Sequence, residues 1–340
     1  MQAGLKTKVA CRVVIVSPAL ADANNGNWQT ARRWQRLLSV AHSARITREW
    51  PDPQASTGAT APAAPDQVML ALHARRSAPS IAAWAQQHGS RGLAVVLTGT
   101  DLYRDIATDA TAQRSLALAQ QLVVLQDQGR QALPEALRAK TQVVFQSTTA
   151  RQALAKTPQH LRAVMVGHLR EEKDPLTLLA AVRLLGQGAG VLIDHIGLPL
   201  DAAFGEAAQA TAAACPHYRW LGGLPHAATR VRIQRAHVLV HTSRMEGGAH
   251  VLMEAVCSGT PVLASRIAGN VGMLGADYTG YFEPGDAAQL AHLLHQARAT
   301  QHLPHGLLAQ LAAQCVLRAP LFAPAAEQQA LLNLVDALRG

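Results

Sequence analysis

The chain is poor in aromatic residues, in charge and in paired cysteines. Aromatic residues make up 4% and charged residues 16% of its 340 positions, and no apolar run reaches the roughly 18 residues needed to cross a bilayer. The positive residues behind the net charge of +9 are dispersed rather than gathered in one stripe, and the aromatic residues on which single strands stack are few. Small phosphate-bearing ligands are therefore favoured over nucleic acid or a membrane. The cysteines form no Cys-x-x-Cys pair, which predicts reduced, structural thiols in a cytoplasmic protein.

The chain is rich in apolar residues, which are arranged in short runs. Apolar residues make up 49% of the total, enough for two domains with sizeable cores. The basic start followed by Val13–Val16 imitates a secretory signal, but its apolar part is short and ends at Ser17-Pro18, so a first β-strand is expected. Arg230, Arg232 and Arg235 are expected to form the solvated face of a helix, because no stacking aromatic residue lies near them.

Strands and helical patterns alternate along the chain, which is typical of parallel sheets covered on both faces. Residues 51–65, rich in Pro, Ala, Ser and Thr, form a predicted loop, either a mobile flap or an insertion. The strands expected in the first half are 12–17, 45–49, 68–72, 93–97, 122–125 and 141–145. Those expected in the second half are 163–166, 191–196, 218–221, 238–241 and 262–265.

Ligands of open parallel sheets bind beyond the carboxyl ends of the strands, and two such domains would combine these edges into one cleft. Gly26 and Asn27 follow the first strand, where a glycine allows close backbone approach and Asn27 suits a helix cap. His73 follows the third strand and Asp101 the fourth, so both are expected at the same edge. A plain strand-to-helix turn and a structural histidine remain the alternatives at these places.

Two glutamates eight positions apart, Glu246 and Glu254, flank a Gly-Gly turn between an apolar strand and an apolar helical segment. Eight helical residues rise about 12 Å, so the two carboxylates cannot share one metal ion. They suit instead the hydroxyl groups at the two ends of a nucleotide sugar. A helix beginning near Gly248 would offer free amides to the diphosphate between them. An ordinary surface helix with two solvated glutamates is the alternative.

This segment resembles the Glu-x7-Glu motif of retaining glycosyltransferases with the GT-B fold, the family 4 type. Residues 164–175 are similar to that family's Gly-Arg-x-x-x-x-Lys segment, with His168 in place of the usual arginine and Arg170 as its substitute beside Lys173. Residues 259–270 are similar to the family's Gly-x-Pro-Val strand and glycine loop, although the acidic residue that usually follows is missing.

The resemblance implies an α/β, GT-B fold of two Rossmann-like domains with parallel sheets facing a central cleft. It implies an acceptor domain at 1–148, a nucleotide-sugar donor domain at 149–318, and a terminal segment, 319–340, whose helix packs back on the first domain. Lys173 and Arg170 would stabilise the leaving diphosphate, Glu246 would orient the donor sugar and Glu254 would hold the ribose. Because these cations substitute for a metal, neither a metal nor another cofactor is expected. The other residues assigned to the donor site are Gly26, Asn27, Gly247, Gly248, Ala249, His250, Gly269 and Asn270.

A looser likeness, over roughly residues 10–300, connects the chain with the selenosugar synthases of selenoneine biosynthesis. The matching segments are Gly26-Asn27, 72–77, 98–103, 166–170, 245–248 and 269–272. This likeness implies transfer of glucose or N-acetylglucosamine from a UDP-sugar to selenophosphate, with other enzymes of that pathway as candidate partners. Arg32, Arg75 and Arg76 would then hold the phosphate of the acceptor. His73 or Asp101 would assist the attack of water on the Se-P bond.

Other functions fit parts of the same pattern. A UDP-sugar epimerase would bind the same donor without making a transfer product. An ordinary glycosyltransferase would use a lipid or a hydroxylated small molecule, and a nucleotide-sugar sensor would bind without turnover. A nucleic-acid binder would lose affinity steeply with salt.

Overall fold

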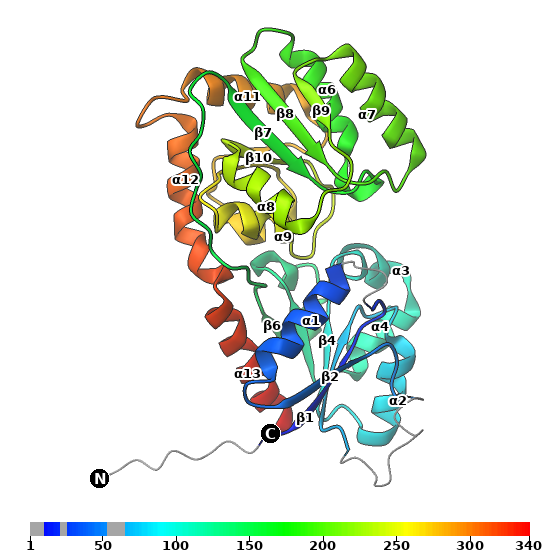
Figure 1. Ribbon diagram of the computed structural model, residues 1–340. Coiled ribbons are helices and arrows are strands. Elements are labelled where there is room, and N and C mark those ends of the chain that lie inside the picture. The colour runs from blue at the N-terminus through cyan, green and yellow to red at the C-terminus, as the bar shows by residue number, and fades with distance from the viewer. Residues whose placement is uncertain (1–9, 21–25, 53–64) are drawn as a thin grey trace, which may run out of the picture. The chain divides into compact units, whose positions relative to one another are not determined.

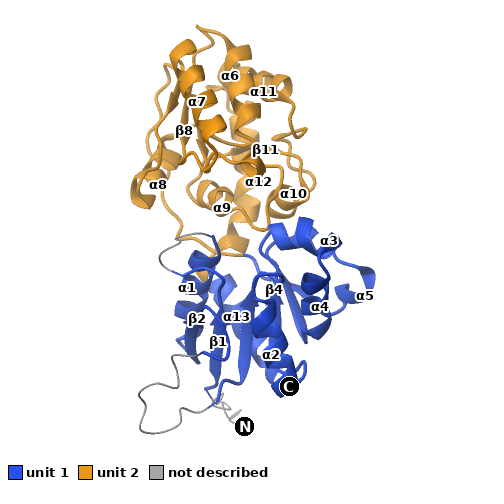
Figure 2. Cartoon of the chain, turned by 90° about the vertical axis from the view of Figure 1, so that its right-hand side faces the viewer, with its two compact units in different colours: residues 1–145, 325–340 blue, residues 146–324 orange. Residues whose placement is uncertain are grey.

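The computed structural model describes residues 10–20, 26–52 and 65–340 (Figure 1). Most of the loop predicted at 51–65 lies outside these ranges. The chain divides into two compact units, coloured separately in Figure 2. Unit 1 comprises residues 1–145 and 325–340, and unit 2 comprises residues 146–324.

Unit 1 contains a parallel six-stranded sheet in the order β2-β1-β3-β4-β5-β6. Its central strands are uninterrupted apolar runs because helices cover both faces; every residue of β3 and β4 is buried. The strands are β1 (Arg12–Val16), β2 (Ser43–Thr47), β3 (Val68–Leu72), β4 (Leu93–Val96), β5 (Gln121–Val124) and β6 (Thr141–Val143).

Successive side chains of the unit 1 strands point to opposite faces, which divides the core in two. Val13 and Ile15 pack with α1 (Gly26–Leu38) and α13 (Pro324–Arg339). Val14 and Val16 pack on the other face with α2 (Ala78–His88) and α4 (Ala110–Leu118). The shorter helices of this unit are η2 (Asp101–Asp105), α3 (Ile106–Thr108), η3 (Asp127–Arg130) and α5 (Glu135–Arg138).

A buried carboxylate joins α13 to α1. Glu327 of α13 accepts hydrogen bonds from Arg33 Nε at 2.8 Å and from Trp34 Nε1 at 2.7 Å. Its side chain is inaccessible to solvent, so these α1 donors must compensate for the loss of its hydration. Helix α13 is therefore joined to α1 by a specific ion pair and packs on the sheet of unit 1 through apolar side chains.

Unit 2 repeats the arrangement with a parallel sheet in the order β12-β11-β10-β7-β8-β9. Helices α6, α7 and α11 pack together, and α8, α9, α10 and α12 form a second connected group. The strands are β7 (Leu161–Val166), β8 (Val191–Ile196), β9 (Tyr218–Trp220), β10 (Val238–His241), β11 (Val262–Ser265) and β12 (Tyr281–Phe282). The helices are η4 (Glu171–Lys173), α6 (Pro175–Leu185), α7 (Ala202–Ala214), α8 (His226–Arg235), α9 (His250–Val256), α10 (Ala268–Leu274), α11 (Ala287–Ala299), α12 (Leu307–Arg318) and η5 (Ala319–Phe322).

The prediction of an α/β chain with two parallel, Rossmann-like sheets is confirmed. The strands expected at 68–72, 191–196, 238–241 and 262–265 occur with the expected bounds. The second strand begins at Ser43, two residues before the expected start, and β12 was not anticipated.

In the described part of the chain, no single helix is long and apolar enough to span a membrane. The helices at residues 307–322 and 324–339, which are bent by 41° relative to each other, meet that length and composition only as a pair.

We expect Glu327→Ala to destabilise unit 1 by about 3–5 kcal/mol, because it leaves Arg33 buried without its carboxylate. Four of the five tryptophans in the sequence, at positions 28, 34, 50 and 84, belong to unit 1. Tryptophan fluorescence during urea unfolding therefore reports mainly on this unit. Glu206→Ala, an exposed change on α7, is the control and should leave the transition in place. An unaltered transition in the Glu327 variant would show that the ion pair adds nothing to stability.

Candidate functional site

Most of the predicted donor residues follow β7, β10 and β11, three adjacent strands of unit 2, on the loops or in the helices that come next. Gly26 and Asn27, which were assigned to the same site, belong to α1 of unit 1. The centre of the unit 2 group is Glu246, whose Oε1 pairs with Lys173 Nζ and lies 3.1 Å from His241 Nε2. Its side chain is only 10% exposed. Unit 2 thus places a carboxylate, an ammonium group and an imidazole at the carboxyl edge of its sheet.

The electrostatics of this cluster keep Glu246 ionised. Burial by itself would raise the pKa of the carboxyl group, but the Lys173 ammonium group and the nearby His241 ring outweigh it and hold the pKa well below its usual range. Burial lowers the pKa of His241 despite the nearby carboxylate. His241 is therefore neutral, and the cluster combines one negative and one positive charge with an uncharged imidazole whose Nε2 lies close to Glu246.

Polar contacts tie the loop after β7 to the loop after β10. Thr242 Oγ1 donates to the Lys173 carbonyl at 2.8 Å, and the Arg244 amide donates to the Glu172 carbonyl at 2.9 Å. Arg244 Nε also donates to Asp174 Oδ2 at 3.0 Å. Asp174 has a φ of 43°, a left-handed conformation that few non-glycine residues adopt. These bonds fix the positions of Lys173 and Glu246 before any ligand binds.

The glycine loop after β11 packs directly against this cluster. A Cβ atom at Gly269 would lie 2.1 Å from the Glu246 carbonyl oxygen, so the close approach requires glycine. Asn270 is wholly buried, and its Nδ2 donates to the Ser265 carbonyl at 2.9 Å. The Asn270 side chain therefore connects the start of α10 to the end of β11, and its contact with the donor stays a prediction.

The helix after the Gly-Gly turn begins later than predicted. α9 starts at His250, not near Gly248, and the Ala249 amide donates to Met273 Sδ at 3.1 Å. This long-range bond occupies one of the amides that we assigned to the diphosphate, and the contact of Ala249 with the donor stays a prediction. Of the other residues assigned to the diphosphate, Gly247 is buried, whereas Gly248 and His250 are partly exposed.

Glu254 is buried, and its carboxylate is paired with two side chains of α8. His226 Nε2 lies 2.6 Å and Arg230 Nη1 3.6 Å from Glu254 Oε1. The pKa of His226 is raised, chiefly because of its hydrogen bond with Glu254. Arg230 is only 3% exposed and also donates to Thr148 Oγ1 at 2.6 Å. The prediction of a solvated Arg230 is therefore wrong, although Arg235 is exposed as expected.

His168 and Arg170 differ in how they could meet a diphosphate. His168 Nδ1 accepts the Leu198 amide proton at 3.1 Å, which leaves the proton of the neutral ring on Nε2. Burial, Arg170 and Lys173 lower the pKa of His168, so the position of the family's usual arginine holds a neutral donor. Arg170 is exposed, with Nε 3.7 Å from Glu172 Oε2. It remains the second cation of this loop.

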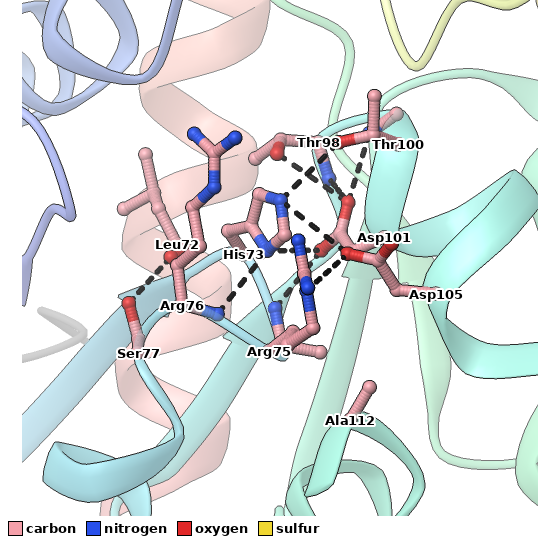
Figure 3. Close-up of polar contacts among 12 residues, drawn as sticks. Leu72, His73, Arg75, Arg76, Ser77, Thr98, Thr100, Asp101, Asp105 and Ala112 are labelled. Atoms are coloured by element: carbon pink, nitrogen blue, oxygen red, sulfur yellow. Dashed lines mark hydrogen bonds and ion pairs between the residues drawn. The ribbon is translucent and has the colours of Figure 1, made fainter. Parts of the chain in front are cut away.

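Unit 1 brings together a second polar group after β3 and β4 (Figure 3). His73 is 2% exposed and has a φ of 72°, a strained conformation that often marks functional positions. Its Nε2 lies 3.2 Å from Thr100 Oγ1 and 3.8 Å from Asp105 Oδ2. Burial, only partly opposed by Asp101 and Asp105, lowers the pKa of His73, so the ring is neutral at neutral pH.

Asp101 has a structural role in this group. Its Oδ2 accepts the Ala74 amide proton at 2.9 Å, and its Oδ1 accepts those of Thr98 and Gly99 at 2.9 and 3.0 Å. The side chain is fully buried, with these bonds visible in Figure 3. Asp101 joins the loops after β3 and β4, and its predicted role in hydrolysis stays a prediction. Asp105, which was not among the residues predicted from the sequence, is the carboxylate nearest His73 Nε2.

The three predicted acceptor arginines are not equivalent. Arg75 Nε donates to Asp105 Oδ2 at 2.9 Å. Arg76 is exposed, and its guanidinium group is directed away from Asp105 (Figure 3). Arg32 is exposed on α1, and in the described chain it shares no hydrogen-bonded partner with them. Gly26 and Asn27 lie within α1, so Asn27 does not cap that helix. Among the residues that the structure describes, none lies within 4 Å of a Cβ atom added at Gly26.

Comparison with known proteins identifies the fold. Residues 146–307 match the family described as glycosyl transferases group 1. Sucrose-phosphate synthase from Thermosynechococcus elongatus is similar over 96% of this chain and 99% of its own, with 16% identity and a TM-score of 0.73. The fold is GT-B. Anabaena Alr3699/HepE, solved in complex with UDP-glucose, has the same GT-B fold over 96% of this chain and 99% of its own, at 14% identity and a TM-score of 0.68. The family match covers the half of the GT-B chain that carries Lys173, Glu246 and Glu254.

The structural role of Asp101 can be tested by Asp101→Asn. We expect a loss of about 1–3 kcal/mol in the stability of unit 1, because the new amide group faces a backbone N–H that has lost its acceptor. Urea unfolding followed by tryptophan fluorescence measures this loss, and the exposed Asp277→Asn is the control. Unchanged stability would contradict the structural role.

Proposed function

We propose that the protein is a glycosyltransferase that uses a UDP-sugar as donor. The observation that carries the proposal is the Lys173, Glu246 and His241 cluster at the carboxyl edge of the unit 2 sheet. This edge is where open parallel sheets bind nucleotides. The match of residues 146–307 to glycosyl transferases group 1 supports the same donor chemistry, as does the UDP-glucose complex of Alr3699/HepE.

The charges of the cluster suit the breaking of the bond between sugar and diphosphate. As that bond breaks, its electron pair stays on the UDP oxygen, and a preorganised cation lowers the energy of the developing charge. Lys173 is the first such cation because it is held in place by Glu246, and Arg170 is the second. Glu246 would exchange part of its contact with Lys173 for the hydroxyl groups of the sugar. Glu254 would accept hydrogen bonds from the ribose.

For the acceptor, we propose selenophosphate. Its selenium attacks the anomeric carbon, so a C-Se bond forms while the C-O bond to UDP breaks. Water then attacks phosphorus, the Se-P bond breaks with its electron pair on selenium, and the products are a selenosugar and phosphate. Exposed arginines support an anionic acceptor, and Arg75 and Arg76 are the candidates to bind its phosphate. Four free, buried cysteines are in keeping with a cytoplasmic protein that handles a reduced selenium compound.

The neutral, buried His73 suits the hydrolytic step, because a general base must be unprotonated to accept a proton from water. Asp105, 3.8 Å from His73 Nε2, would stabilise the imidazolium that forms. The same histidine favours a second candidate function, in which His73 deprotonates a hydroxyl acceptor in an ordinary glycosyl transfer. The two functions differ in product, which makes them separable.

The deciding experiment mixes the purified protein with selenophosphate and either UDP-glucose or UDP-N-acetylglucosamine. We expect mass spectrometry to detect a sugar product with the selenium isotope pattern, together with UDP and phosphate. A product formed only with a hydroxylated acceptor would favour the ordinary glycosyltransferase. A new UDP-sugar without free UDP would identify an epimerase, and binding without any product would identify a sensor.

In the donor site, Glu254→Ala should weaken UDP binding about tenfold or more, because a charge-assisted hydrogen bond contributes about 1.5–3 kcal/mol. Lys173→Ala should also lower kcat by about 10²–10³, since it removes a charge that stabilises the transition state. Calorimetry with UDP and steady-state kinetics measure the two effects. Glu206→Ala serves as the control. UDP affinity unchanged in both variants would refute the donor site.

In the acceptor site, Arg75→Ala should raise the KM for selenophosphate about tenfold while leaving UDP affinity unchanged, because one phosphate contact is lost. The exposed Arg36→Ala on α1 retains the same net charge as this variant and is its matched control. Equal KM values in the two variants would remove Arg75 from the acceptor site.

A further inference from the structure

A cavity in unit 2 lies at the opposite edge of the sheet from the donor cluster. His237 directly precedes β10 and Pro261 directly precedes β11, and both line the cavity. Glu246 and Gly269 follow the carboxyl ends of the same two strands. Four strand residues extend about 13 Å, so the cavity is separate from the cluster around Glu246.

The cavity has a volume of about 350 Å³ and combines apolar walls with one ammonium group. Pro158, Pro261 and Leu308 supply apolar surface, together with Ala309 and Ala312 of α12. Lys156 lines the same space. Within the described residues, no aspartate or glutamate is part of this lining, so the ammonium group has no counter-charge there.

Lys156 is also without a hydrogen-bonded or ion-paired partner in the described part of the chain. Burial lowers its pKa to about 8, which reflects the cost of keeping a charge in a poorly hydrated place. Lys140 is different, since its Nζ donates to the Leu116 and Ala119 carbonyls at 2.8 and 2.7 Å. A half-buried ammonium group without such acceptors can gain substantially from an anionic ligand.

The neighbouring histidine forms a fixed and uncharged wall. His237 Nδ1 accepts the Arg162 amide proton at 2.9 Å, and its Nε2 donates to the Thr157 carbonyl at 3.0 Å. Gln301 Nε2 donates to the same carbonyl at 3.1 Å. Burial lowers the pKa of His237 to about 4, so it adds no charge at neutral pH. The segment that carries Lys156 is thereby held against the amino ends of the strands.

From this cavity we infer a binding site for a small organic carboxylate with an apolar body. The carboxylate pairs with the Lys156 ammonium group, and the body packs against Pro261, Leu308 and Ala312. Lys156 is the one lysine or arginine among the described lining residues, which matches a ligand with one negative charge. The apolar walls distinguish such a ligand from an inorganic anion. This site does not depend on the proposed glycosyl transfer.

Hexanoate is a suitable probe, and the lysines themselves can report its binding. The sequence contains five lysines, at positions 6, 8, 140, 156 and 173, so reductive ¹³C-methylation gives a simple NMR spectrum and keeps the positive charges. We expect hexanoate to shift the Lys156 signal saturably and to raise the pKa of Lys156. Lys140 is the internal control and should not respond, because its Nζ is already bonded to carbonyl groups.

Two variants separate the charge from the cavity. Lys156→Met, which should fold because it replaces a half-buried ammonium group with an apolar chain, should abolish saturable hexanoate binding in ligand-observed NMR. Ala312→Phe fills the cavity but keeps the lysine, so the Lys156 signal should remain and no longer respond. Circular dichroism checks that both variants fold.

Hexanol, which lacks the charge, and inorganic phosphate, which lacks the apolar body, should not cause a saturable shift. Any of three results would overturn the inference: no response of Lys156 to hexanoate, an equal response to phosphate, or unchanged hexanoate binding by the folded Lys156→Met variant.

Discussion

The contact between Lys173 and Glu246 is the constraint on which the proposed donor site depends. A buried carboxylate needs a compensating charge, and here one ammonium group and one imidazole, from His241, supply it. The contact joins residues 73 positions apart in the sequence. It therefore also determines how the loops after β7 and β10 lie, with Thr242 and Arg244 reinforcing the arrangement through backbone carbonyls and Asp174. A site built this way has its charges oriented before a ligand arrives, which is the property that electrostatic catalysis requires.

Both units use buried carboxylates, but for different purposes. The carboxylate oxygens of Asp101 accept hydrogen bonds from three backbone amides. These bonds connect two loops of unit 1. Asp105, four residues later, pairs with Arg75 and lies close to His73. The strained backbone of His73 is maintained by this network, since each loop is bonded to the next. Unit 1 thus combines a rigid support with a histidine that burial keeps neutral.

Glu254 is paired with side chains of helix α8 and is not a solvated surface glutamate. The sequence presents the arginines of α8 as a solvated face, yet Arg230 is buried beside Glu254 and Arg232 Nη1 lies 3.1 Å from Asp194 Oδ2. His226 and Arg230, one helical turn apart, both point their charged groups to one carboxylate. This spacing is a sequence signal of a shared face, but nothing in the sequence says what the face contacts. In the proposed function, Glu254 binds the ribose from within this network.

Local sequence was sufficient for the strands and for the fold class. The runs 68–72 and 238–241 are continuously apolar or nearly so because both faces of a parallel sheet are covered, and the structure has strands with those bounds. The two glutamates and the Gly-Gly turn were also recognisable, since their spacing is a local property. Only the tertiary structure decided which polar atoms remain available. Met273 accepts the Ala249 amide from 24 residues away, backbone amides occupy Asp101, and Asn270 is buried behind its loop. Periodicity follows from the geometry of one strand or helix, whereas burial and pairing depend on segments that meet only when the chain has folded.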